Sequence, residues 1–210
     1  MLTITSPSQV STCSVLFEGM DLAGKSTAIK ALQTREPSAQ VRHLSLGEGN
    51  KLYAQAKLIN RLGAYSSDTV GTMYLAAIKA DLENHVPASG VVLQDSIGLL
   101  RSLAHHTALG NQLLVDHLHG LAQFHPRFSH TFVFTASIKA RQTRLQKRML
   151  ENPKTISNAD RLVLHDAELF RQMDTAIIEN AVRYFDATVV DTSHMSIADV
   201  EEYVCARVYS

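Results

Sequence analysis

The chain has 210 residues, 45% of them hydrophobic and 19% charged, which is enough apolar material for one folded domain of ordinary size. Its formal net charge is zero, which argues against a nucleic-acid polymer as the main partner, because proteins that bind such polymers are usually basic. The sequence contains no uninterrupted run of about 18 apolar residues, so we expect no membrane span. Two distant cysteines, Cys13 and Cys205, lack metal or redox spacing and suit a reducing compartment, so we expect a cytoplasmic protein without a signal peptide.

Short apolar runs alternate with helical patterns after a lead rich in Ser, Thr and Pro, residues 1–12, that we expect to be flexible. The predicted strands are residues 13–17, 41–46, 91–95, 131–134 and 187–191. The predicted helices are residues 25–33, 51–62, a long one capped by Ser67 or Asp68, 99–124 with a break near Gly110, 138–150, 161–184 and 197–208. Because strands that alternate with helices pair in parallel, we predict one α/β domain over residues 13–210, a three-layer sandwich with about five parallel strands.

The stretch between the first predicted strand and the first helix reads Gly-Met-Asp-Leu-Ala-Gly-Lys-Ser over residues 19–26, a complete G-x-x-x-x-G-K-[ST] motif. Its glycines let the backbone turn so that consecutive N–H groups face phosphate oxygens, and the helix dipole adds positive potential. The lysine reaches the β- and γ-phosphates and the serine hydroxyl ligates Mg²⁺, so ATP and Mg²⁺ are the expected cofactors. The alternative is an ordinary glycine turn. The expected nucleotide-binding residues here are Gly19, Asp21, Ala23, Gly24, Lys25, Ser26 and Thr27.

Two acidic residues lie near this loop. Asp95 ends the predicted strand 91–95, where a carboxylate suits a direct or water-mediated Mg²⁺ ligand together with Ser26; the alternative is a cap for the next helix. Asp21 lies inside the loop, and a carboxylate that pointed inward there would repel phosphate. We therefore expect Asp21 to face the phosphoryl acceptor.

A basic helix over 138–150 and a polar segment over 151–160, with Pro153, predict a small lid at about 149–162. In small-molecule kinases such a lid brings arginines onto the transferring phosphoryl group and excludes water. Three of the basic residues share one helix face by their spacing, and the alternative for any of them is a solvated basic face. The candidates are Arg141, Arg144, Lys147, Arg148, Lys154 and Arg161, and the expected catalytic residues are Lys25, Asp95, Arg144 and Arg148.

The segment LFEGMDLAGKST, residues 16–27, resembles the start of the thymidylate kinases, whose loop typically reads F-E-G-x-D-x-x-G-K-S-T. Weaker likenesses follow in order at 74–96, 135–148 and 189–204, so the resemblance covers nearly the whole chain. It implies a P-loop NTPase fold with a lid and γ-phosphoryl transfer from ATP–Mg²⁺, and it is compatible with a homodimer. It also implies that Asp21 contacts the acceptor and that the loop at Thr192 lies beside the adenine.

The acceptor side departs from that family's pattern. The family has an arginine directly after the strand aspartate, where this chain has Ser96, with Arg101 as a compensating candidate. The positions matching the family's base-stacking aromatic and base-reading arginine are Leu75 and Lys79. By resemblance, the expected acceptor-binding residues are Asp21, Lys79, Ser96 and Arg101.

The sequence favours a kinase of a small-molecule acceptor, most simply a nucleoside monophosphate. A nucleoside or a non-nucleotide metabolite stays open as the acceptor, and a nucleotide-binding regulatory module with little or no transfer is the alternative of another class. No pair of the ten histidines has the helical spacing of a metal site, and His105 or His106 is a candidate acceptor contact.

Overall fold

The computed structural model describes residues 13–47, 49–87, 89–156 and 158–209, so the predicted flexible lead, residues 1–12, lies outside the described residues. The described residues form a five-stranded, wholly parallel sheet in the order β2-β3-β1-β4-β5. The strands are β1 (Cys13–Glu18), β2 (Gln40–Leu44), β3 (Val91–Ile97), β4 (His130–Thr135) and β5 (Thr188–Asp191). The predicted α/β fold with a parallel sheet is thus confirmed.

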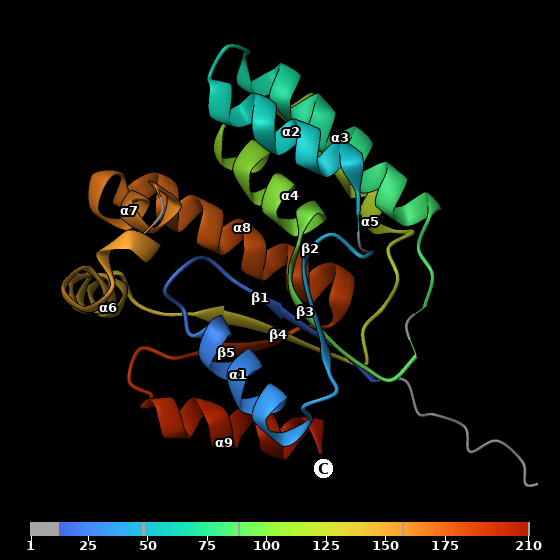
Figure 1. Cartoon of the computed structure of the whole chain (residues 1–210). Helices are drawn as coiled ribbons and strands as arrows, with labels where there is room; N and C mark the ends of the chain where they lie inside the picture. The colour runs from blue at the N-terminus through green and yellow to red at the C-terminus, as the bar shows by residue number, and fades with distance from the viewer. Residues whose placement is uncertain (1–12, 48, 88, 157, 210) are drawn as a thin grey trace, which may run out of the picture.

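Helices cover both faces of this sheet (Figure 1). On one face, α1 (Lys25–Arg35) and α9 (Ile197–Val208) pack together over Phe17, Phe132 and Phe134. The other face is covered mainly by α4 (Gly98–Ala108), α5 (Gln112–Ala122) and α8 (Ala167–Phe185). Because all five strands are parallel, their carboxyl ends lie at the same edge of the sheet, between these two apolar layers.

Four further helices surround that edge (Figure 1). They are α2 (Lys51–Leu62) and α3 (Ser67–Glu83), which pack against each other, and α6 (Ile138–Glu151) and α7 (Asn158–His165), which lie on the other side of the edge. The predicted helix 51–62 is confirmed in its bounds, and Gly63 ends it in the left-handed conformation at φ 63°.

Several predicted boundaries are wrong. Neither Ser67 nor Asp68 caps α3, because the Ser66 hydroxyl accepts the N–H of Thr69. The segment 151–160 is not a plain loop, since it holds a 3₁₀ turn, Pro153–Thr155, and the start of α7. The predicted helix 161–184 is two helices, separated where the Asp166 carboxylate caps α8.

The strand expected to end at Asp95 runs two residues further. Its extension pairs with β2, where Leu44 lies opposite Ile97. The Ile97 N–H also donates to the buried Glu18 carboxylate at 3.0 Å, which satisfies its backbone at the end of the strand. Asp95 and Ser96 therefore lie within a strand rather than at the start of a loop.

Candidate functional site

The loop after β1 has the backbone geometry that the motif predicts. Gly19 adopts φ 125°, and a Cβ there would lie 2.0 Å from the carbonyl oxygen of Phe134, so only glycine fits. Gly24 adopts φ 101° and precedes Lys25, the first residue of α1. Leu22 is also left-handed at φ 65°, an uncommon conformation for a branched residue. The loop thus wraps the positive end of the α1 dipole, which is where an anion binds.

Lys25 is folded back onto this loop. Its ammonium donates to the carbonyl oxygens of Gly19 at 2.5 Å and Met20 at 3.2 Å, and the residue is buried. Burial, together with the nearby Arg101 charge, lowers the pKa of Lys25 to about 8 against the opposing effect of the surrounding carboxylates. A triphosphate would offer this ammonium stronger acceptors than two neutral carbonyls.

A buried ion pair joins the end of β1, just before the loop, to α4. Glu18, fully buried, accepts the N–H of Gly19 at 3.0 Å and pairs with Arg101 Nε at 3.1 Å. Arg101 Nη2 donates to the Gly19 carbonyl at 2.6 Å and to Ser96 Oγ at 3.1 Å. Burial opposes the charged form of Arg101, but Glu18 and other carboxylates outweigh it and raise the pKa above its usual value. The structure therefore brings Ser96 and Arg101 together beside the loop.

Arg144 fastens the loop to the β5–α9 connection. Its guanidinium donates to the Leu22 carbonyl at 2.9 Å and to the Thr192 hydroxyl and carbonyl at 2.9 and 2.6 Å. The Thr192 hydroxyl in turn donates to the Ala23 carbonyl at 2.9 Å. Three segments that are far apart in sequence are held at one point, with Gly24 packed against Thr192.

The other lid candidates divide into two groups. Arg141 is fully buried, pairs with Asp174 at 2.8 Å and lies over the ring of Phe170, so its position is that of an internal strut and not of a lid residue. Arg148 lies on the cavity side of α6 and pairs with Asp160 at 3.0 Å. Lys147 also lines the cavity, whereas Lys154 and Arg161 are not among the lining residues.

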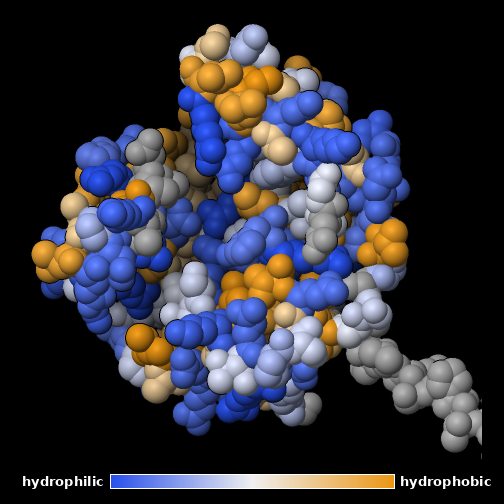
Figure 2. All heavy atoms as spheres, viewed as in Figure 1, coloured by the Kyte–Doolittle hydropathy of each residue, from blue (hydrophilic) through white to orange (hydrophobic). Residues whose placement is uncertain are grey.

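The loop and the cavity-facing residues of α6 line a cavity of about 1360 Å³ at the carboxyl edge of the sheet. Figure 2 shows the surface hollowed between the α6–α7 side and the α2–α4 side, with hydrophilic side chains gathered in the hollow. The half beside the loop and α6, here called the donor half, is lined by Asp21, Ala23, Gly24, Lys25, Ser26, Thr27, Arg144, Lys147, Arg148, Asp160, Thr192, Met195 and Ile197, among others.

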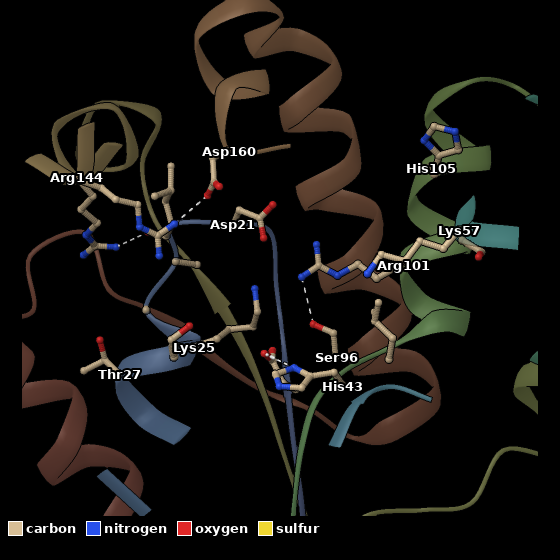
Figure 3. Close-up of a pocket in the computed structure, with 18 of the residues that line it drawn as sticks. Asp21, Lys25, Thr27, His43, Lys57, Ser96, Arg101, His105, Arg144 and Asp160 are labelled. Carbon is tan, nitrogen blue, oxygen red and sulfur yellow. Dashed lines mark hydrogen bonds and ion pairs between the residues drawn. The ribbon is translucent and has the colours of Figure 1, made fainter. Parts of the chain in front are cut away.

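The opposite half, here called the acceptor half, combines side chains of five elements. It includes His43 of β2, Tyr53 and Lys57 of α2, Val70, Gly71 and Tyr74 of α3, Asp95 and Ser96 of β3, and Arg101 and His105 of α4. Figure 3 shows Lys57 extending from α2 into the cavity toward Arg101. The carboxylate of Asp95 lies beside His43, with the imidazole Nδ1 3.0 Å from Asp95 Oδ2.

Lys57 is the acceptor-half cation that sequence reasoning missed. Arg101 is neutralised by Glu18, and burial lowers the pKa of His105 and of His106. The salt bridges among the described residues do not include Lys57. The sequence offered no signal for it, because α2 carries polar residues on several faces.

Lys79 is not brought into the site. It is exposed on α3, where it pairs with Glu83 at 3.7 Å, and it is not among the residues that line the cavity. The cavity-facing side of α3 carries Ser67, Val70, Gly71 and Tyr74, at the i, i+3, i+4 and i+7 spacing of one helix face. Leu75, the residue after Tyr74, packs against the core instead. The two positions expected from the resemblance, Leu75 and Lys79, therefore lie on other faces of α3 than the cavity-facing one.

The strand order and the glycine-rich loop between β1 and α1 are those of the P-loop kinase fold. More particularly, the fold is like that of the thymidylate kinases. The thymidylate kinase from Candida albicans superposes with a TM-score of 0.68 at 14% identity, over 94% of this chain and 91% of that chain. The thymidylate kinase from Ehrlichia chaffeensis gives 0.62 at 14% identity, over 95% and 99%.

A deoxyadenosine kinase from M. mycoides, determined with bound dATP, gives a TM-score of 0.56 at 14% identity over 94% of this chain and 100% of that chain. No protein-family model matches the chain, and no curated protein matches its sequence. At 14% identity these likenesses establish the fold. Among the described residues, no helix is both long enough and apolar enough to cross a membrane.

Proposed function

We propose that the chain is an ATP-dependent kinase that transfers the γ-phosphoryl group of ATP to a small-molecule acceptor, with a nucleoside monophosphate as the favoured acceptor. The observation that carries the proposal is one cavity with two unlike halves. The loop at Gly19–Ser26 opens into its donor half, and Lys57 extends into its acceptor half. A nucleotide-binding protein without transfer would not need a second polar pocket joined to the first.

The donor half has the chemistry to hold ATP and Mg²⁺. Consecutive backbone amides, the α1 dipole and Lys25 suit the phosphates. The hydroxyl of Ser26, with the carboxylate of Asp95 from the adjoining acceptor half, would supply the oxygen ligands that Mg²⁺ prefers. When bound, the ion would neutralise charge on the β- and γ-phosphates. Arg144 would hold the loop and the β5–α9 connection at Thr192 together around the nucleotide. Arg148 would exchange its ion pair with Asp160 for one with the phosphates.

The acceptor half favours a substrate with a ring and an anionic group. Tyr53 and Tyr74 meet edge to face at 5.3 Å between ring centroids and line the cavity together, which suits a flat heterocycle. Lys57, as a cation without a salt-bridge partner among the described residues, suits the phosphate of a monophosphate. Asp21 lies between the two halves, where its carboxylate would accept from an acceptor hydroxyl.

The absence of an arginine at Ser96 keeps a nucleoside or another metabolite as the second candidate acceptor. Since Arg101 already donates to Ser96 and Gly19, the acceptor half has fewer free guanidinium donors than a site built for a dianion would need.

The test is acceptor-dependent ADP release by the purified protein. The panel pairs each monophosphate with its nucleoside, dTMP with thymidine and AMP with adenosine, and Lys25→Met serves as the inactive reference. Turnover with a monophosphate and not with its nucleoside supports the proposal, and the reverse selects the nucleoside. Tight Mg²⁺-dependent ATP binding without transfer to any acceptor would instead support a regulatory module.

A further inference from the structure

His43 and Asp95 form a pair in the lining of the cavity. β2 is one of the two edge strands of the described sheet and runs parallel to β3, with His43 directly opposite Asp95 in the register. The imidazole Nδ1 lies 3.0 Å from Asp95 Oδ2, and both residues line the cavity next to Lys25 (Figure 3). The His43 side chain is 69% exposed and that of Asp95 22%. The imidazole therefore lies toward solvent, and the Asp95 carboxylate is more covered but still accessible to a ligand.

The backbone bends immediately after each member of this pair. Leu44, after His43, has φ 61°, and Ser96, after Asp95, has φ 61°. The β2–β3 register also shifts between His43 and Leu44, and the N–H of Ser45 donates to the His43 carbonyl at 2.6 Å. Positive φ is unfavourable for residues with side chains, and it persists only where other contacts impose it.

Specific contacts impose these bends. The carboxylate of Asp81 on α3 accepts from the hydroxyl of Ser45 at 2.7 Å and from the N–H of Leu46 at 3.0 Å, which holds the chain after β2. Ser96 is held through its hydroxyl by Arg101. The backbones of β2 and β3 thus both bend directly after the pair, which keeps His43 and Asp95 facing each other at the edge of the cavity.

Two cations, Lys25 and Arg101, attract the Asp95 carboxylate and compete with His43 for it. Burial lowers the pKa of Lys25, and the charge of Asp95 opposes that shift, so the ammonium and this carboxylate attract each other; the same attraction acts between Asp95 and Arg101. Among the described residues, His43 is the one hydrogen-bond or ion-pair partner that the structure gives to the Asp95 carboxylate. Without the imidazole, the carboxylate is free to turn toward Lys25, where it would occupy the ammonium that the phosphates need.

We propose that His43 is a positioning residue that holds the Asp95 carboxylate through Oδ2 and so keeps Asp95 apart from Lys25. This inference rests on the proposed function, because it assigns Asp95 to the metal–nucleotide site. It needs only a hydrogen-bond donor at the place of Nδ1. Asparagine can supply such a donor and leucine cannot.

The test compares His43→Leu, His43→Asn and a matched control, His117→Leu, which removes an exposed histidine of α5 that does not line the cavity. Manganese binding to each protein in the presence of a non-hydrolysable ATP analogue is measured by electron paramagnetic resonance, alongside kcat and KM for ATP and thermal unfolding. Because loss of a residue that orients a metal ligand typically costs 10- to 100-fold, we expect His43→Leu to weaken Mn²⁺ binding and lower kcat/KM by about that factor. We expect His43→Asn to restore both to within roughly threefold and His117→Leu to match the wild type.

The result that overturns the inference is a His43→Leu protein whose Mn²⁺ affinity equals that of His117→Leu. An equal loss in His43→Asn and His43→Leu also overturns it, since the donor would then not be what matters. If the wild type releases no ADP with any acceptor yet His43→Leu weakens Mn²⁺–nucleotide binding, the proposed kinase function fails while the positioning role stands. If the wild type is an active kinase and His43→Leu is unchanged, the positioning role alone fails.

Discussion

The donor half and the acceptor half of the cavity are built in different ways. Seven consecutive residues, 21–27, supply most of the phosphate-facing part of the donor half, and its cations are tied to backbone: Lys25 to the Gly19 carbonyl and Arg144 to those of Leu22 and Thr192. The acceptor half draws on β2, α2, α3, β3 and α4, and its cation Lys57 has no salt-bridge partner among the described residues. The first half is local and preorganised, and the second depends on how five elements pack.

Under the proposed function, the first half would supply the chemistry common to kinases and the second would select the substrate. A phosphate site made of consecutive amides survives changes in the surrounding sequence, because the backbone provides the donors. A pocket made of side chains from separate helices changes with each substitution on their inner faces. The predictions below test whether the two halves can be altered independently, in order of expected effect.

The largest effect is expected in the donor half. Replacing Lys25 by methionine should lower kcat/KM about a thousandfold, because the ammonium is a preorganised charge at the transferring phosphoryl group. Circular dichroism should stay unchanged, since the methionine chain fits the same buried space. Lys30→Met, on the exposed side of α1, is the matched control. Normal turnover by Lys25→Met would remove the phosphate site from this loop.

A large effect on stability, rather than on chemistry, is expected at Arg141. Methionine there leaves the Asp174 carboxylate without its buried partner, which should cost about 3 kcal/mol in the free energy of unfolding. The exposed pair of Arg171 and Glu168 provides the control, because Arg171→Met should change stability by less than about 0.5 kcal/mol. Urea denaturation measures both. Equal stabilities would mean that Arg141 is not a strut.

In the acceptor half, Lys57→Met should raise KM for a phosphate-bearing acceptor about tenfold and leave KM for ATP unchanged, because one charge-assisted hydrogen bond is lost. Lys51→Met, on the same helix but outside the cavity lining, is the control. The effect should disappear with an acceptor that lacks the phosphate. A change in KM for ATP would show instead that the two halves are not independent.

The smallest effect is expected outside both halves, at His125. The centroid of this buried ring lies 5.0 Å from that of the Phe185 ring, and His125 is not among the residues that line the cavity. Burial lowers its pKa to about 4 from an ordinary value near 6.5, so the unfolded chain binds more protons between these values and stability falls as pH drops through that window. From pH 7.5 to 5.5 the wild type should lose about 1 kcal/mol at this residue.

The check is the difference in unfolding free energy between the wild type and His125→Phe, measured by denaturation at several pH values. The two proteins should diverge in slope as pH falls and agree in slope above pH 7.5. Kinase activity should be alike in both at neutral pH. Parallel curves throughout would mean that His125 is protonated equally in the folded and unfolded chains.

Much of the fold could be predicted because the hydrophobic pattern alternates clearly between strand and helix. The errors occurred where a single polar residue decides a boundary: Ser66 caps α3, and Asp166 separates α7 from α8. Lys79 was expected in the acceptor half from a matched position, yet it faces away, because a shift of one residue turns a helical side chain by about 100°. Asp95 was a candidate from its place at the end of a predicted strand, but neither Lys57 nor His43 gave a local signal.

By itself, the sequence determined the parallel α/β order and the glycine-rich loop with Lys25 at the start of α1, because both depend on residues close together in the chain. The tertiary structure alone decided which cations are occupied and which extend into the cavity: Arg141 became a buried strut, Arg101 was neutralised by Glu18, and Lys57 was placed in the acceptor half. The physical reason is that a loop of consecutive amides forms from local backbone geometry, whereas the partner of a charged side chain is set by which distant elements pack beside it.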